Sequence, residues 1–278
     1  MTAGGERYTV LGASGFIGRH LVRRLERAGA EVLAPPRGSD LVFHEELGHV
    51  FYCIGLTADW RNRPFDAVRA HVERLVEILE RARFRSLTYL SSTRVYKRAA
   101  VATEDALLGA LPEKRDDLFD LSKMMGESIC LTDTRATRVA RLSNVYGDDL
   151  VSDNFLSSVI RDALRGSVAL RSSLDSAKDY VGVEEVVDLL IRIATSGRER
   201  VYNVASGSNT SNREILGELG RLTGCELRLG EGAPTTTFPL IAVDRLRREF
   251  QFSPRSVVAA LAGLVEDFRT HRELWEKP

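Results

Sequence analysis

Short apolar runs alternate with amphipathic segments through the first half of the chain. Five runs have the length and composition of strands: 8–11, 31–34, 50–54, 86–90 and 137–141. Apolar residues recur at helical spacing in three segments between them: 16–28, 64–82 and 118–131. This alternation predicts βαβ units and an α/β fold, a Rossmann-type doubly wound parallel sheet. Only residues 35–49 separate the second and third strands, so we expect an abbreviated crossover there.

Beyond residue 150 the pattern loosens and helices dominate. The predicted helices are 154–165, 184–196, 212–223, 243–250 and 254–271, with short strand-like pieces at 201–204 and 226–229. Two of these helices have clear start signals. Ser211 followed by Glu214 predicts a capping box, and Ser253 before Pro254 predicts an N-cap with proline at the first helical position. No repeat or low-complexity linker interrupts the chain.

Glycines break the first apolar run at a position that favours a dinucleotide site. Gly12, Gly15 and Gly18 lie in the run Y-T-V-L-G-A-S-G-F-I-G, directly before an amphipathic helix. Glycine permits positive φ and close approach of a ligand, and a helix N-terminus attracts a pyrophosphate. The spacing is G-x-x-G-x-x-G, which differs from the standard G-x-G-x-x-G fingerprint. We therefore predict a dinucleotide-binding Rossmann domain over 1–148 and a smaller α/β substrate-binding part over 149–278, with 178–205 packing back on the first domain.

Composition excludes several other classes of protein. The chain has 278 residues, with 39 basic and 39 acidic side chains, so neither nucleic acid nor a membrane surface is an expected partner. No apolar run approaches the ~20 residues of a membrane span, and the N-terminal residues lack the apolar core of a secretion signal. The three cysteines and five histidines have no metal-binding spacing. We expect a cytoplasmic protein with reduced thiols and no metal.

Six motifs in order resemble an extended short-chain dehydrogenase/reductase of the NAD(P)-dependent epimerase/dehydratase family, which modifies nucleotide sugars. They are G-A-S-G-F-I-G at 12–18, F-Y-C-I-G at 51–55, Y-L-S-S-T-R-V-Y at 89–96, L-S-K-M-M-G-E at 121–127, R-L-S-N-V-Y-G at 141–147 and A-K-D-Y-V-G-V at 177–183. The resemblance implies NADP or NAD as cofactor, a nucleotide-sugar substrate, and hydride transfer at a ring carbon, with C4 expected. It does not separate an epimerase from a reductase.

The resemblance also implies particular site residues. The cofactor contacts would come from Gly12, Ser14, Gly15, Phe16, Ile17, Gly18, Arg37, Asp40, Leu41, Cys53, Ile54, Gly55, Ser91, Lys123 and Leu142. The substrate contacts would come from Arg94, Asn144, Asn154, Phe155 and Lys178. Asn154 and Phe155 fit a helix cap and a core aromatic equally well. For Arg94, a surface ion pair is the alternative to a contact with a substrate phosphate or carboxylate.

The proton-transfer apparatus departs from the family pattern at one residue. Family members use a Tyr-x-x-x-Lys pair with a Ser or Thr, and here Lys123 is preceded at that spacing by Phe119. Phenylalanine has no ionisable proton. Three explanations stay open: an engineered Tyr→Phe change, a natural variant that uses Thr93 or Tyr96 as the acid, or a catalytically silent NADP-binding regulator. A reductase of non-sugar ketones is a further enzyme alternative.

Two departures bear on reaction and cofactor. Ser92 aligns with the catalytic hydroxyl, but Thr93 and Arg94 stand where sugar 4,6-dehydratases of the family carry Asp-Glu, which argues against dehydration. After the second strand, Pro36 replaces the expected acid and Arg37 follows it. A guanidinium there suits a 2′-phosphate, so NADP is favoured. By family analogy we also expect a homodimer through segments 64–82 and 118–131, which carry apolar residues on more than one face.

Overall fold

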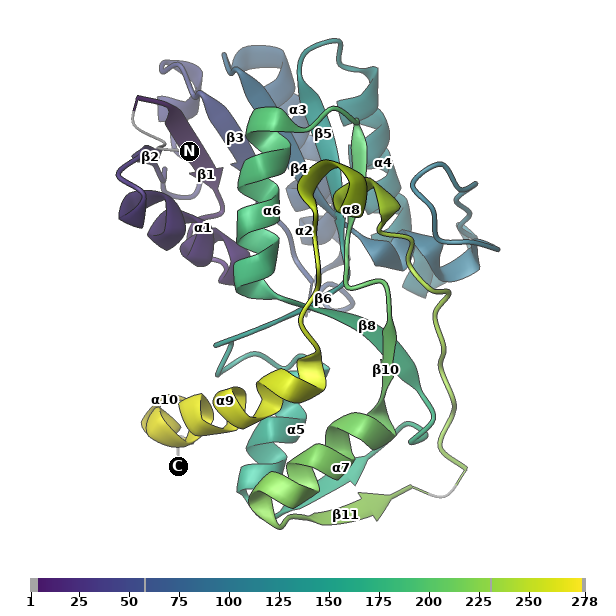
Figure 1. Cartoon of the computed structure of the whole chain (residues 1–278). Helices are drawn as coiled ribbons and strands as arrows, with labels where there is room; N and C mark the ends of the chain where they lie inside the picture. Colours follow the sequence, from purple (N-terminus) through teal and green to yellow (C-terminus); the bar gives the residue numbers. More distant parts are fainter. Residues whose placement is uncertain (1–4, 58, 231, 277–278) are drawn as a thin grey trace.

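A six-stranded parallel sheet forms the centre of the first part of the molecule, in a computed structural model that describes residues 5–57, 59–230 and 232–276 (Figure 1). Its order is β2-β1-β3-β4-β5-β9, and every pairing is parallel. The strands are β1 (Arg7–Leu11), β2 (Glu31–Leu33), β3 (His49–Tyr52), β4 (Ser86–Ser92), β5 (Thr137–Leu142) and β9 (Val201–Val204). The predicted Rossmann-type sheet is confirmed.

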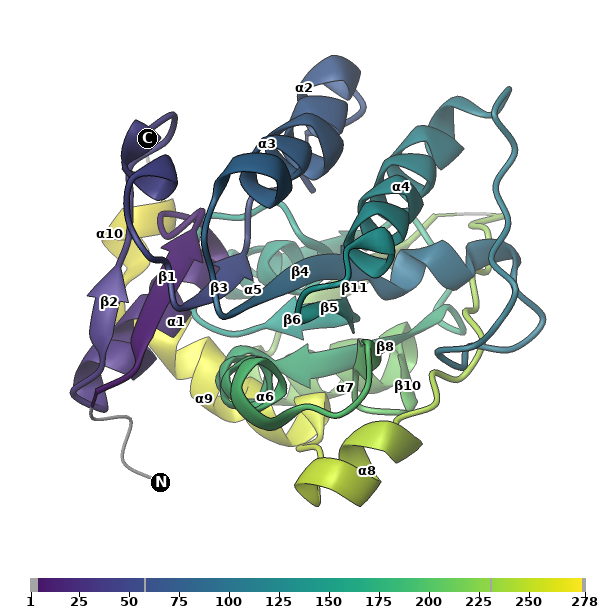
Figure 2. The same cartoon turned by 90° about the horizontal axis from the view of Figure 1, so that it is seen from above.

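Helices cover both faces of this sheet (Figure 2). On one face lie α1 (Phe16–Arg27) and α6 (Val183–Ser196), with α8 (Asp244–Phe250) beside β9. On the other face lie α2 (Pro64–Val68), α3 (Arg74–Arg81) and α4 (Leu118–Thr132). The predicted helix 64–82 is therefore interrupted, because a π-helical turn over Arg69–Glu73 separates α2 from α3. The expected short crossover between β2 and β3 is a single 3-10 turn, Asp40–Phe43.

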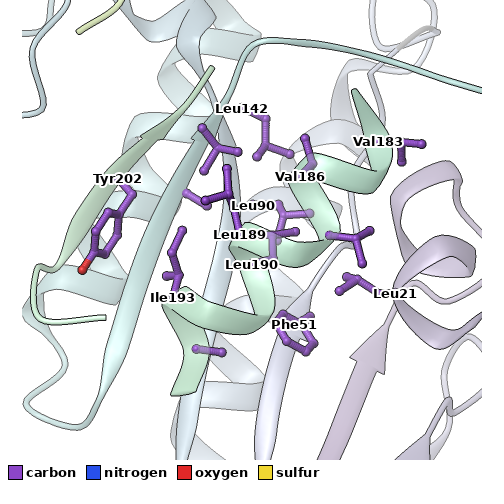
Figure 3. Close-up of a cluster of buried hydrophobic side chains, with 14 of the residues drawn as sticks. Leu21, Phe51, Leu90, Leu142, Val183, Val186, Leu189, Leu190, Ile193 and Tyr202 are labelled. Carbon is purple, nitrogen blue, oxygen red and sulfur yellow. The ribbon is translucent and has the colours of Figure 1, made fainter. Parts of the chain in front are cut away.

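The α6 face is held by a continuous apolar cluster (Figure 3). Val186, Leu190 and Ile193 of α6 are fully buried and point toward Phe51 and Leu90 of the sheet. Each buried side chain of this size contributes about 1.5–3 kcal/mol relative to exposure. The cluster fixes α6 and β9, which follow residue 178 in the chain, to the strands that carry the glycine loop.

The remaining elements form a smaller α/β part below the main sheet in Figure 1. One small sheet is β10-β8-β6, made of β6 (Asn144–Tyr146), β8 (Ala177–Gly182) and β10 (Asn209–Ser211), and another pairs β7 (Ser167–Leu170) with β11 (Glu226–Leu229). Helices α5 (Phe155–Leu164), α7 (Asn212–Thr223) and α9 (Val257–Thr270) pack together in a second core, followed by α10 (Arg272–Trp275). The strands β6, β7, β8 and β10 were not among the predicted elements.

The two predicted helix starts have different outcomes. The Ser211–Glu214 capping box is present at the start of α7. The start predicted at Ser253-Pro254 is wrong, because α9 begins at Val257 with Ser256 as its N-cap residue. Gln251 ends α8 in a left-handed conformation with φ of 52°, and residues 252–256 connect it to α9 without regular secondary structure.

Candidate active site

The glycine loop between β1 and α1 forms an open cradle. Gly12 has a φ of +87°, and a Cβ atom there would lie 2.9 Å from the carbonyl carbon of Cys53. A Cβ on Gly18 would lie 2.2 Å from the oxygen of Gly12, so the first helical turn packs directly on the loop. Gly15 is the N-cap residue and supplies no side-chain cap, which leaves the N–H groups of the first turn available for an anion. These residues fit a dinucleotide pyrophosphate.

The other predicted cofactor residues follow the carboxyl ends of neighbouring strands, where ligands bind in open α/β sheets. Exposed Arg37 follows β2, and Asp40 and Leu41 begin the 3-10 turn after it. Residues 53–55 follow β3, and Leu142 ends β5. Ser14 and Arg37 are both exposed, and within the described ranges no ion pair involves Arg37. Ser91 instead donates a 2.5 Å hydrogen bond to buried Glu127, so its hydroxyl serves the interior of the sheet.

Lys123 lies at the centre of the site. It is buried on α4, and its Nζ donates a 2.8 Å hydrogen bond to the carbonyl oxygen of Leu90, near the end of β4. Burial lowers the pKa of Lys123 to about 7, although the Glu127 carboxylate acts in the opposite direction. A Cβ added to Gly55 would lie 3.6 Å from this nitrogen. The end of β3, the end of β4 and the middle of α4 therefore converge on one buried amine.

Phe119 lies one helical turn before Lys123 and is covered by other side chains. Its ring is 4% exposed and packs with Trp60, at a centroid distance of 5.7 Å. The Arg94 guanidinium carbon lies 5.6 Å from the Phe119 ring centroid and 5.5 Å from that of Trp60. Phe119 thus belongs to a small aromatic cluster at the position where the family places its phenol.

His71 connects this cluster to the loop after β3. Its Nε2 accepts a 3.3 Å hydrogen bond from the Leu56 N–H, so Nδ1 carries the proton and donates to Ser122 Oγ at 2.8 Å. Ser122 in turn donates to the carbonyl oxygen of Phe119. Burial lowers the pKa of His71 to about 2, and the charge of Lys123 acts in the same direction, so the imidazole is neutral.

The three hydroxyl candidates have different surroundings. Ser92 Oγ accepts a 3.2 Å hydrogen bond from the Arg94 N–H, and no acceptor for its own proton lies among the described residues. The Thr93 side chain is half-buried and has no hydrogen bond with any described residue. Tyr96 is different: its buried hydroxyl donates to Asn203 Oδ1 and accepts from Arg141, both at 2.7 Å. The alternative that Tyr96 is the acid is therefore disfavoured, because its hydroxyl is committed to an internal network.

Four of the five predicted substrate residues lie on β6, on β8 and at the start of α5, and the fifth, Arg94, lies in the turn after β4. The half-buried Lys178 on β8 has its Nζ 5.6 Å from the ring centroid of Phe155. Asn144 donates a 2.8 Å hydrogen bond from Nδ2 to the carbonyl oxygen of Asp179. Asn154 caps α5: its Oδ1 accepts from the Ser157 N–H at 2.9 Å, and its Nδ2 donates to Asp149. The amide of Asn154 is therefore engaged in local structure.

Sequence reasoning missed His71, Trp60 and Asp120. A signal for His71 was present, since it precedes Leu75 and Ile78 by four and seven residues and so lies on the buried stripe of that segment. No comparable pattern marks Trp60 or Asp120. The described residues contain no group of three or more His, Cys, Asp or Glu arranged to hold a metal ion. Within the same residues, no helix combines the length and apolarity that a membrane span requires.

The fold and its glycine loop are those of a dinucleotide-binding α/β protein. A family model described as "NAD dependent epimerase/dehydratase family" matches residues 8–205. The chain belongs to this family, which confirms the resemblance noted from its motifs and the NAD(P) cofactor class.

Relatives with known roles are similar over most of the chain. GDP-6-deoxy-D-mannose reductase of Pseudomonas aeruginosa is 26% identical over 81% of this chain and 82% of its own length. A dTDP-4-dehydro-6-deoxy-D-allose reductase of Streptomyces bikiniensis is 25% identical over 96% of this chain and 97% of its own length. Among solved structures, MoeE5 in complex with UDP-glucose and NAD superposes with a TM-score of 0.82 at 24% identity, covering 96% of this chain and 99% of that one. That likeness supports the fold.

Proposed function

We propose that this protein is an NAD(P)-dependent oxidoreductase or epimerase that acts on a nucleotide-diphosphate sugar. Hydride would be transferred at a ring carbon of the sugar, and C4 is the first candidate. The observation that carries the proposal is the placement of Lys123, which is buried, bonded to Leu90 near the end of β4 and close to Gly55 after β3. The two reductases that are similar to most of the chain have names that specify nucleotide-linked deoxy sugars, which supports reduction over epimerisation.

The residues of this chain have distinct roles in such a reaction. Bound nicotinamide would supply or accept the hydride. Ser92 would orient the substrate oxygen, because its hydroxyl proton has no acceptor in the described structure. Lys123 would hold the nicotinamide ribose and place a positive charge beside the reacting oxygen. Phe119 cannot exchange a proton, so we infer that the chain as given turns over slowly and that a hydroxyl at this position would raise the rate.

Cofactor preference is a second part of the proposal. Arg37 is exposed directly after β2, and Pro36 stands where an acid would repel a 2′-phosphate. We propose that NADP(H) is preferred over NAD(H). Gly15, whose φ of −74° any residue can adopt, would face the pyrophosphate.

The main rival is a catalytically silent protein that binds NADP, and Phe119 is the observation that favours it. The buried Lys123 favours an enzyme, since a silent protein has no need of a buried amine at this place. A buried amine whose pKa is strongly shifted is frequently found at a functional site.

The proposal is tested by binding. Mass spectrometry of small molecules released from the purified protein should detect a nicotinamide dinucleotide, a nucleotide sugar or both. Calorimetric titration should then show cofactor binding that Gly15→Val weakens at least about tenfold, because the added side chain blocks the pyrophosphate approach. Gly217→Val is the matched control, since nothing lies within 4 Å of a Cβ there. Failure of all nicotinamide dinucleotides to bind would refute the proposal.

A further inference from the structure

Arg94 is held more rigidly than an ordinary surface arginine. Its Nε donates to Asp120 Oδ1 at 2.8 Å, and its Nη2 donates to the carbonyl oxygen of Asp116 at 3.0 Å. The guanidinium also lies against the rings of both Trp60 and Phe119, which are in contact with each other. The side chain is nevertheless 29% exposed. A guanidinium fixed in this way has already lost its rotamer freedom, so it binds a ligand without that entropic cost.

The contacts of Arg94 leave one nitrogen of its guanidinium group without a partner. Within the described structure, Nη1 has no hydrogen-bond partner. Asp120 contributes one oxygen to the pair, while its Oδ2 is buried without a partner. Burial raises the pKa of Asp120 above the usual range for a carboxyl group, with Arg94 acting in the opposite direction. Asp120 therefore positions the guanidinium through a single hydrogen bond, and Nη1 of Arg94 is left to donate to another group.

A second cation, Lys178 on β8, belongs to the smaller part of the molecule. Burial lowers the pKa of Lys178, and the positive charge of Arg94 lowers it further. No ion pair of Lys178 with an acidic side chain occurs within the ranges described above. Of the two cations, Arg94 is paired with Asp120, whereas among the described residues Lys178 has only the Phe155 ring beside its amine. A bound anion would relieve the repulsion between the two cations.

We propose that Arg94 selects a nucleotide sugar whose hexose ring carries a carboxylate, a nucleotide-linked uronic acid. This inference rests on the proposed function and names its substrate class. Arg94 follows Ser92 by two residues and lies against Phe119, so its guanidinium would be near the reacting sugar. Lys178, beside Phe155, is left for the diphosphate. The unpartnered Nη1 would donate a charge-assisted hydrogen bond to such a carboxylate.

The test compares three ligands that share one nucleotide: the nucleoside diphosphate, its neutral hexose conjugate and the matching hexuronate. The comparison is made separately with uridine, guanosine and thymidine nucleotides. Affinities are measured by calorimetry with NADP present, for the parent chain, Arg94→Gln and Arg94→Lys. Arg61→Gln is the matched control, because Arg61 also stacks on Trp60, at 4.6 Å, but pairs with Asp116 and is 51% exposed.

The parent chain should bind the hexuronate at least about tenfold more tightly than the neutral hexose, the range of a charge-assisted hydrogen bond. Arg94→Gln should remove this preference and leave the affinity for the nucleoside diphosphate within about twofold of the parent value. Arg61→Gln should keep the preference for the hexuronate. Arg94→Lys should retain part of it.

Three results would overturn the inference. Equal affinity of the parent chain for hexose and hexuronate excludes the carboxylate. An equal loss for the nucleoside diphosphate in Arg94→Gln assigns Arg94 to the diphosphate instead. A parent chain that binds NADP but none of the nucleotide ligands overturns the proposed nucleotide-sugar function as well, which distinguishes that failure from the first two.

Discussion

The imidazole of His71 meets the ring of Phe119 edge to face, with centroids 5.2 Å apart and planes at 90°. The same imidazole accepts a hydrogen bond from Leu56 and donates to Ser122 on α4. His71 therefore ties the loop after β3 to the helix that carries Phe119 and Lys123. It is a positioning residue, since it is fully buried and neutral.

Stability should fall in acid because of His71. Its pKa in the folded chain is lowered from 6.5 to about 2, so below pH 6.5 only the unfolded chain binds this proton. Each pH unit below 6.5 then costs about 1.4 kcal/mol. Between pH 7 and pH 5, urea unfolding should show the parent losing about 2 kcal/mol more than His71→Gln. The exposed His44→Gln is the control, and parallel curves for parent and His71→Gln would contradict the prediction.

Lys123 should extend the same rise of stability with pH into alkaline solution. Its pKa is lowered from 10.5 to about 7, so between these values the unfolded chain binds a proton that the folded chain lacks, and stability rises with pH. From pH 7 to pH 9 the cofactor-free parent should gain about 2–3 kcal/mol relative to Lys123→Met. Lys114→Met, at an exposed position, should follow the parent. No relative gain would show that the buried amine keeps its ordinary pKa.

Arg37 should determine cofactor choice. Calorimetric titration should show tighter binding of NADP(H) than NAD(H), and Arg37→Ala should remove most of that gap because the guanidinium contacts the 2′-phosphate. Arg27→Ala, at the end of α1, serves as a control for general charge. Equal affinities of the parent chain for both cofactors would rule out this role.

The protein should form a dimer through α2, α3 and α4. Leu75 and Leu79 are buried within the fold, whereas Phe65 is 77% exposed and Met125 is 54% exposed. Apolar side chains of this size on the outer face are suited to a partner helix. Light scattering should give a dimer mass at micromolar concentration, Met125→Glu should lower it, and Leu107→Glu, in a loop, should not. A monomer mass for the parent chain would contradict this prediction.

Contiguous motifs made much of the fold and of the candidate site predictable. The glycine loop, Ser92 and Lys123 belong to short sequence patterns whose local structure is fixed by strand ends and helix starts. Trp60, His71 and Asp120 could not be placed in this way. Their positions depend on the π-helical turn at Arg69–Glu73 and on how α2 and α4 pack, which are properties of tertiary structure. The small strands β6 and β8 were missed because they are short and interrupted by polar residues.

We propose that this site transfers hydride to or from a nucleotide sugar and lacks only the proton-transferring hydroxyl at Phe119. The most direct test is the turnover number of the parent chain and of Phe119→Tyr with a panel of nucleotide sugars and NADP(H). General acid–base catalysis contributes roughly 10²–10⁴-fold, so Phe119→Tyr should raise turnover by that order with little change in cofactor or substrate affinity. Lys123→Met in the Phe119→Tyr background should abolish the gain. A parent chain that already turns over at typical enzyme rates, with no gain from the added hydroxyl, would contradict the claim and make Thr93 the next candidate acid.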